Sequence, residues 1–176
     1  NSSSWGYNWT IQNRLTGGTQ ALITSSSASE LNSSLTTFDS NTSIDDGWTS
    51  GSTSGLYLNF KRAPGFFDMV TYDGTGAGAT HNHSLGVEPE MMIIKQRSST
   101  ESWIVYHKEL YESLTGNFRL LTLNEDYDPN SNISRLNSTQ PTSSVFSVGS
   151  DASTAGQTYI THLFASLSGI SKVGTY

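Results

Sequence analysis

The chain has 176 residues, which is long enough for one sizeable hydrophobic core. Its 30 serines, 21 threonines and 16 glycines, with only 14% charged residues, indicate a neutral, hydroxyl-rich surface and favour strands and turns over helices. A net charge of -6 without a basic cluster argues against nucleic acid as a partner, and the absence of cysteine excludes disulfides, cysteine nucleophiles and thiolate metal sites.

Short strands are predicted along the first third of the chain. Apolar and polar residues alternate in several stretches, as they do in half-buried strands. These stretches are separated by Gly, Ser and Asn turns and by a long polar excursion over residues 25–55. The expected strands are 7–11, 21–24, a weak strand at 34–39, and 56–62, which stops at Pro64-Gly65.

The middle of the chain contains its longest apolar run. Residues 66–72 predict a strand, a glycine-rich turn follows at 73–78, and residues 79–83 form a short strand. Residues 90–96 carry Met91, Met92, Ile93 and Ile94 in succession, which is typical of a strand covered on both faces. We expect this strand to be the central one.

The last third continues the same pattern. The segment 108–114 suits a single helical turn, and 124–132 is an acidic loop. Many short strands with almost no helix predict an all-β fold of β-sandwich or jelly-roll type with little or no helix. The remaining expected strands are 103–107, 118–123, 144–148, 158–165 and 170–176.

An internal repeat organises these elements. Residues 60–72 align without a gap on residues 164–176, an offset of 104, and Trp9 and Trp103 take equivalent places, so both are expected in the core. We therefore interpret 1–65 as a first, partial β repeat and 66–176 as a second, full one, the two related halves packing as one compact unit around 90–96. The missing counterpart of 90–96 and the start without methionine suggest a segment of a longer polypeptide.

Three stretches carry a resemblance to a known family. They are 83–97, which opens with His-x-Leu-Gly-x-x-Pro, then 103–108 and 61–68. In these stretches the chain resembles an uncharacterised repeat domain of bacteriophage virion proteins, which occurs in tail-fibre-like and other structural proteins, notably of marine phages. The resemblance implies a component of the virion surface and brings no catalytic residues.

Two groups of residues are candidate metal ligands. His81 and His83 are two positions apart, so on a strand both rings point to one face, where chains around an axis could gather several of them. The acidic loop places oxygen ligands at every second position, as a calcium loop does, through Asp126, Asp128, Asn130 and Asn132. The alternatives are hydrogen-bonded histidines at a strand end and a plain solvated loop without a turn glycine.

Other functional signals are weaker. Trp48 lies in the polar excursion and is a candidate for stacking on a sugar or for anchoring the loop. Serines and histidines occur without a nucleophile motif, and no two carboxylates are singled out as a hydrolytic pair. We therefore expect no enzymatic activity and no cofactor.

Taken together, these features predict a non-enzymatic virion surface or fibre module that binds a host receptor glycan or otherwise adheres. The alternatives are a purely structural or decoration protein of the capsid or tail, and a lectin-like carbohydrate-binding module outside a virus. The expected partners are other virion proteins or copies of the chain itself, as a homo-oligomer, and a host surface glycan. We expect no nucleic acid, no membrane insertion, and a location at the virion surface or outside the cell.

Overall fold

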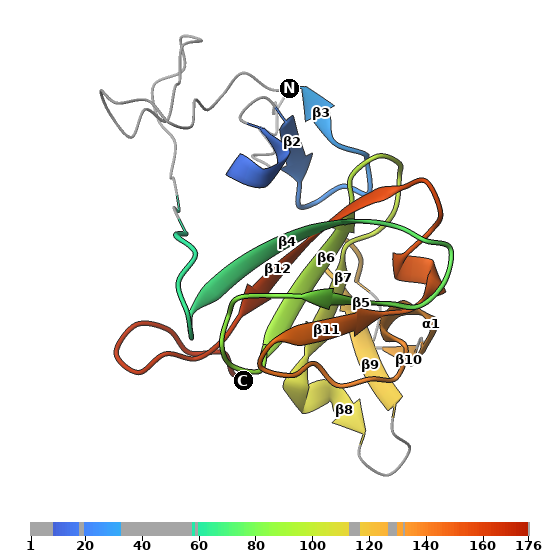
Figure 1. Ribbon diagram of the computed structural model, residues 1–176. Coiled ribbons are helices and arrows are strands. Elements are labelled where there is room, and N and C mark those ends of the chain that lie inside the picture. The colour runs from blue at the N-terminus through green and yellow to red at the C-terminus, as the bar shows by residue number, and fades with distance from the viewer. Residues whose placement is uncertain are drawn as a thin grey trace, which may run out of the picture.

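The computed structural model describes residues 9–17, 20–32, 58, 60–112, 117–126, 130–131 and 133–175. These residues form twelve strands, one four-residue α-helix, α1 (Ile133–Leu136), and three short 3-10 helices. The prediction of an all-β fold with little helix is confirmed (Figure 1). The described residues contain no helix of sufficient length and apolarity to span a membrane.

The largest sheet is antiparallel throughout and is built from seven strands. Six of them follow the order β10-β9-β7-β6-β12-β4, and β8 pairs with β9 beside this path. Their bounds are β4 (Phe67–Asp73), β6 (Met91–Gln96), β7 (Ile104–His107), β8 (Tyr111–Glu112), β9 (Asn117–Thr122), β10 (Asn130–Ser131) and β12 (Thr158–Phe164).

Strand β6 is central, as its apolar run predicts. It pairs with β7 on one side and with β12 on the other. Because side chains alternate between the faces of a sheet, Met92 and Ile94 enter one core while Ile93 enters another. Both faces are therefore covered, which explains why the sequence here is apolar without interruption.

One face of the large sheet packs against a small two-stranded sheet. This second layer consists of β5 (Ala79–Asn82) and β11 (Val145–Val148), which pair antiparallel and lie in front of β6, β7 and β12 in Figure 1. Phe146 and Val148 of β11 are completely buried between the layers. The resulting main core gives the fold its sandwich-like character and also includes Tyr72, Leu85, Met92, Ile94, Tyr106, Phe118, Leu120, Tyr159 and Leu163.

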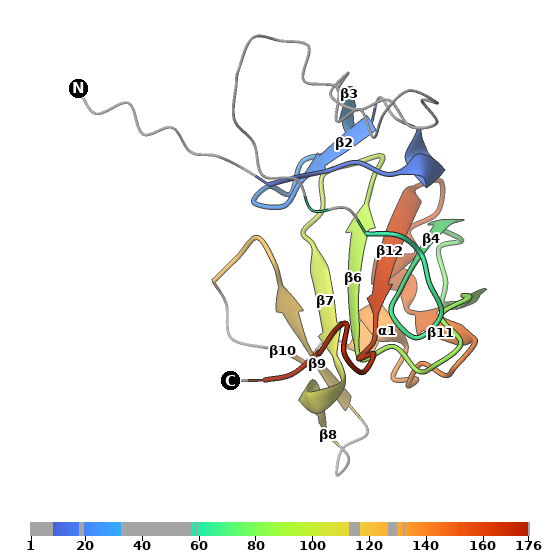
Figure 2. The ribbon, with the colours of Figure 1, turned by 90° about the vertical axis from the view of Figure 1, so that its left-hand side faces the viewer.

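The opposite face carries a three-stranded sheet at its upper end in Figure 2. This sheet has the order β1-β2-β3, with β1 (Thr10–Ile11), β2 (Gln20–Ile23) and β3 (Leu31–Asn32). Leu22 packs there against Trp103 and Ile160 in a second, smaller core. The indole N–H of Trp103 donates to the carbonyl oxygens of Ile23 and Ser26 at 3.1 and 3.0 Å, which fastens the small sheet to the large one.

The two tryptophans predicted to be equivalent differ in burial. Trp103 has no exposed surface, so its predicted place in the core is confirmed. Trp9 is 54% exposed, so the same prediction is wrong for Trp9. The physical reason is that Trp103 lies between two sheets, whereas Trp9 precedes the short strand β1 beyond the edge of the second core.

In the residues that the structure describes, the strands predicted at 56–62 and 170–176 do not form. Leu58 and the residues 60–62 belong to no strand, and after Ser171, which makes one isolated bridge to Leu167, residues 172–175 are irregular. A strand-like sequence is not sufficient for a strand, because the backbone N–H and C=O groups of a strand also need a neighbouring strand for their hydrogen bonds. The weak strand expected at 34–39 lies outside the described residues, and the helical turn expected at 108–114 is a 3-10 helix over Lys108–Leu110 that leads into β8.

The turn predicted by the repeat is built twice with the same geometry. Phe66 N–H donates to Ala63 O at 3.1 Å, and Ile170 N–H donates to Leu167 O at 2.9 Å. The third residue of each turn is a glycine at positive φ, Gly65 at 72° and Gly169 at 76°, as a type II turn requires. We call them the first turn (63–67) and the second turn (167–171), and both lie at the same end of the large sheet (Figure 1).

Candidate functional site

The first turn positions a small group of polar side chains at the start of β4. Pro64 and Gly65 suit the two central positions of a type II turn, so the sequence itself dictates the reversal. Gly65 N–H donates to Leu85 O at 2.7 Å, which ties the turn to the segment that follows β5. This bond brings Ser84 beside the first residues of β4.

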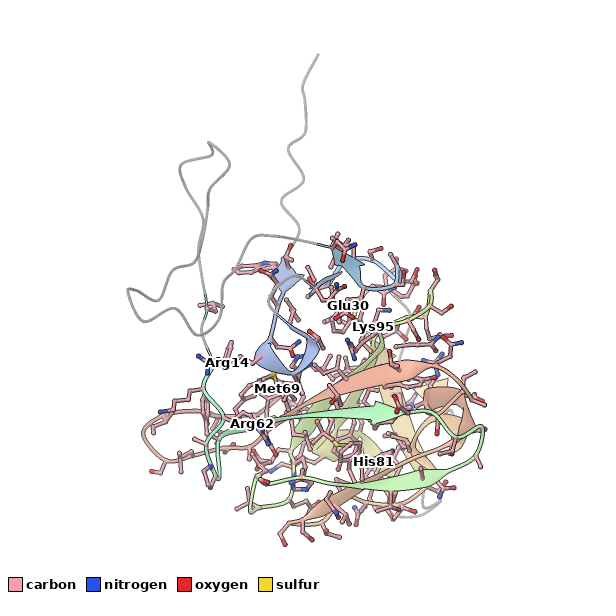
Figure 3. All side chains as sticks on the ribbon, turned by 45° about the horizontal axis from the view of Figure 1, so that its top comes forward. Arg14, Glu30, Arg62, Met69, His81 and Lys95 are labelled. Atoms are coloured by element: carbon pink, nitrogen blue, oxygen red, sulfur yellow. The ribbon has the colours of Figure 1, made fainter. Side chains whose placement is uncertain are left out.

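Asp68 is the centre of this group. Only 2% of its surface is exposed, and its carboxylate accepts hydrogen bonds from Met69 N–H at 2.8 Å and Ser84 N–H at 2.6 Å. The guanidinium of Arg62, whose side chain is 45% exposed, forms an ion pair with the same carboxylate. A buried carboxylate needs such partners, because its desolvation is otherwise very costly. Figure 3 shows Arg62 beside the beginning of β4.

A shallow pocket of about 230 Å³ opens at this position. Its polar lining residues are Arg62, Asp68 and Ser84, of which Arg62 and Ser84 are exposed. Ala63, Pro64 and Phe67 supply an apolar side. Charged donors and acceptors beside a flat apolar surface are suited to a small ligand that carries hydroxyl groups on an apolar skeleton.

Exposed apolar side chains surround the same end of the sheet. Phe60 is 49% exposed and its ring lies 5.4 Å from that of Phe67, which lines the pocket. Val87 follows the segment tied to the first turn and is 41% exposed, and Ile170 at the tip of the second turn is 69% exposed. We call these three residues, together with Leu58 at 61% exposure, the apolar end.

His81 and His83, predicted as candidate metal ligands, lie close together, and both rings pack or hydrogen-bond within the fold. Both rings approach Phe146, at 5.5 Å for His81 and 6.5 Å for His83, as expected for one face of β5. His83 is held by Leu85 N–H, which donates to Nδ1 at 3.2 Å, and by Thr142 O at 3.1 Å from Nε2. His81 stacks on Tyr72 at 4.1 Å, and burial lowers the pKa of His81.

The acidic loop and Trp48 lie mainly outside the described residues. Asp126 is described and exposed, whereas Asp128, Asn132 and the side chain of Asn130 are not described, and Trp48 falls in the undescribed stretch 33–57. Among the described residues no three His, Asp or Glu side chains are grouped as a metal site would need. The calcium and sugar-stacking hypotheses for these residues stay predictions.

Two further charged side chains, Glu90 and Lys95, are held by hydrogen bonds to other segments of the fold. Burial acts to raise the pKa of Glu90, but hydrogen bonds from Lys108 and Ser166 outweigh it and leave that pKa below its ordinary value. Lys95 has no exposed surface, and its ammonium donates to Ser27 O at 3.2 Å and Gln96 O at 2.6 Å. Figure 3 shows Lys95 near Glu30, beneath the small sheet.

Lys95 makes the free energy of unfolding depend on pH. Burial lowers the pKa of Lys95 from 10.5 to about 8, so the unfolded chain binds this proton more tightly than the folded chain. Stability conferred through Lys95 therefore rises with pH between these two values and is lowest below pH 8. Relative to Lys95→Met, we expect the unmodified protein to gain about 3 kcal/mol between pH 7 and pH 10.5, at 1.36 kcal/mol per pKa unit.

Urea unfolding of both proteins at half-unit pH steps measures this difference. The comparison cancels the titration of the buried tyrosines, which both proteins share. A constant difference across the range would contradict the assignment of a low pKa to Lys95.

Sequence reasoning did not assemble the pocket. Arg62 and Asp68 lie in the stretch 61–68 and Ser84 in the stretch 83–97, both of which carry the family resemblance, but nothing in the sequence singled these residues out or brought them together. Asp68 was one of several carboxylates among which no hydrolytic pair stood out. The usable signal was the Pro64-Gly65 pair, because a tight turn brings the residues on its two sides together. The contact with Ser84 depends on tertiary packing and has no local signal.

Comparison with known proteins identifies the family. Residues 49–176 match a protein family described as a domain of unknown function (DUF7483). The chain belongs to this family. The matched residues include the large sheet, the β5–β11 sheet and the pocket, whereas β1, β2 and β3 precede them. No curated protein and no solved structure is significantly similar to the chain.

Proposed function

We propose that the chain is a non-enzymatic surface module of a bacteriophage virion that attaches to a host glycan, with one sugar residue held in the pocket of Arg62, Asp68 and Ser84. The observation that carries the proposal is the composition of this pocket. The exposed side chains of Arg62 and Ser84 offer hydrogen bonds to sugar hydroxyls, and exposed Pro64 offers an apolar contact for the ring. Buried Asp68 holds the guanidinium of Arg62 in place. The resemblance to virion repeat domains supports the location at a virion surface.

The pocket favours binding over hydrolysis. Glycoside hydrolysis ordinarily needs two carboxylates flanking the scissile bond, and Asp68 is the single carboxylate among the residues that line this pocket. Its oxygens are already engaged by Arg62, Met69 and Ser84, so this carboxylate positions the guanidinium of Arg62. The neighbouring apolar end offers additional contact area for a longer polysaccharide.

Filling the pocket tests this function. Ser84 is exposed and holds Asp68 through its backbone N–H, so Ser84→Tyr blocks the pocket while leaving the Asp68 bond intact. We expect at least a ten-fold loss of affinity for envelope polysaccharide of the host, measured by isothermal titration calorimetry. Thr100→Tyr, at an exposed position beyond the other end of β6, is the matched control and should bind as the unmodified protein does.

Three results would contradict the proposal. They are equal binding by the two tyrosine variants, no binding by the unmodified protein, and release of oligosaccharides from the polysaccharide. The last would indicate an enzyme. Absence of glycan binding together with a regular assembly would favour a purely structural role in the capsid or tail.

A further inference from the structure

The two turns occupy equivalent places in the internal repeat, so the segments before and after them can be compared. The first turn leads into β4, and β12 leads into the second turn, 104 residues later. By this offset, Leu58 and Phe60 before the first turn correspond to His162 and Phe164 of β12. Likewise the residues 171–175 after the second turn correspond to the first part of β4.

Within one chain, the strand before the second turn, β12, pairs with the strand after the first turn, β4. Strand β12 lies antiparallel to β4 along its whole length, with Phe164 opposite Phe67 and His162 opposite Met69. Ala165 N–H then donates to Phe66 O at 3.1 Å, so this pairing continues into the first turn. One combination of before-turn and after-turn segments is thus satisfied inside the chain.

The segment before the first turn and the segment after the second turn have no such strand pairing within the described part of the chain. Leu58 and the residues 60–62 precede the first turn as β12 precedes the second, yet they lie outside any strand. Residues 172–175 follow the second turn as β4 follows the first, and they also lie outside any strand. Leu58 and Phe60 alternate with polar residues, as in a strand, and they are 61% and 49% exposed.

We propose that copies of this chain associate head to tail, with residues 171–175 of one copy pairing antiparallel with Leu58 and residues 60–62 of the next. Shifting the register of β12 and β4 by 104 places Leu58 opposite Val173 and Phe60 opposite Ser171. This contact uses two different surfaces, so it is heterologous and each copy retains one of each for further growth. The partner is a second copy because the repeat supplies both halves of a pairing already present in the fold.

The proposal also accounts for the position of the apolar end. Leu58, Phe60 and Ile170 lie on the two segments that would pair or at the tip of the second turn between them. Main-chain bonds of an added strand supply affinity, and alternate side chains fix the register. The inference does not rest on glycan binding, and the pairing segment adjoins the pocket at Arg62.

Disulfide trapping between two chains tests the register. The protein has no cysteine, so equal amounts of Leu58→Cys and Val173→Cys chains can join only through the introduced residues, and never within one chain. Directly opposite residues have Cβ atoms about 4.5–5.5 Å apart, near the separation a disulfide needs. We expect the mixed dimer to form at least five-fold faster than in a mixture of Leu58→Cys with Lys172→Cys, whose side chain points to the other face.

Sedimentation equilibrium without cysteines is the second measurement. The unmodified protein should show a mass above 19.1 kDa that rises with concentration. Leu58→Lys should return it to the monomer mass, whereas Leu123→Lys, at another exposed leucine, should not. A monomer at every concentration, equal trapping of the two cysteine mixtures, or equal effects of the two lysine variants would overturn the proposal.

Discussion

Replacing Trp103 by alanine is expected to lower the free energy of unfolding by about 4 kcal/mol, within the range for large-to-small changes at buried aromatic residues. Trp103 has no exposed surface and packs with Leu22 and Ile160 between the large sheet and the β1-β2-β3 sheet. Alanine leaves a cavity there, and the carbonyl oxygens of Ile23 and Ser26 lose their shared donor. Chemical denaturation measures the loss.

The region destabilised by Trp103→Ala is as informative as the loss of free energy. Hydrogen exchange should increase most in β2, because Trp103 fastens that strand to the large sheet, and least in β4 and β12. Trp103→Phe is the matched control, since it keeps most of the apolar contact and removes the N–H. We expect about 1–2 kcal/mol from that change, as for an unsatisfied buried acceptor. Equal losses for the two variants would show that packing contributes nothing beyond the hydrogen bonds.

Replacing Gly74 by alanine is expected to cost about 3 kcal/mol, as strong overpacking does. A Cβ atom at this position would lie 2.1 Å from Thr154 O and 2.8 Å from the carbonyl carbon of Ser153. These are backbone atoms, and Gly74 N–H donates to Gln157 O at 2.8 Å while Gly76 N–H donates to Ser153 O at 2.6 Å. The turn at 73–78 and the segment 153–157 are thus held together by backbone hydrogen bonds, so they cannot move apart to make space for a Cβ atom.

Gly156 provides the control for this prediction. It has φ of 74°, but a Cβ atom there would meet nothing within 4 Å. Gly156→Ala therefore carries only the cost of the left-handed conformation, about 1–2 kcal/mol. Thermal denaturation of both variants separates steric exclusion from backbone strain. A smaller loss for Gly74→Ala than for Gly156→Ala would be incompatible with the observed packing of the two loops.

The packing of the loops follows from the aromatic stack beneath them. Tyr72 and Tyr159 stack with centroids 5.0 Å apart, and Tyr72 O–H donates to Ala152 O at 2.8 Å. Thr154 N–H donates to the phenolic oxygen of Tyr159 at 3.0 Å. These bonds draw the segment 152–154 onto the end of β4. The glycine-rich turn after β4 was predicted from its composition, but the need for glycine at position 74 comes from this approach across the sheet.

The sequence by itself determined the class of fold and the position of its main strands. Residues 91–96 form a central strand because the segment is short, opens with the apolar run 91–94 and is bounded by Pro89 and polar residues. Such an apolar run is stable only when both faces of the strand are covered. The repeated turns were determined too, since Gly65 and Gly169 allow the positive φ that each turn requires. These properties depend on neighbours in the chain or on the pattern of a single segment.

Only the tertiary structure decided which strand-like segments became strands and which polar residues came together. The sequence of residues 58–62 alternates as that of a strand does, but hydrogen bonds between strands need a partner, and β12 is already paired on both sides. The burial of Trp103 but not Trp9, and the meeting of Arg62, Asp68 and Ser84, likewise depend on contacts between segments distant in the sequence. Such contacts are set by the packing of whole sheets, which no local pattern encodes.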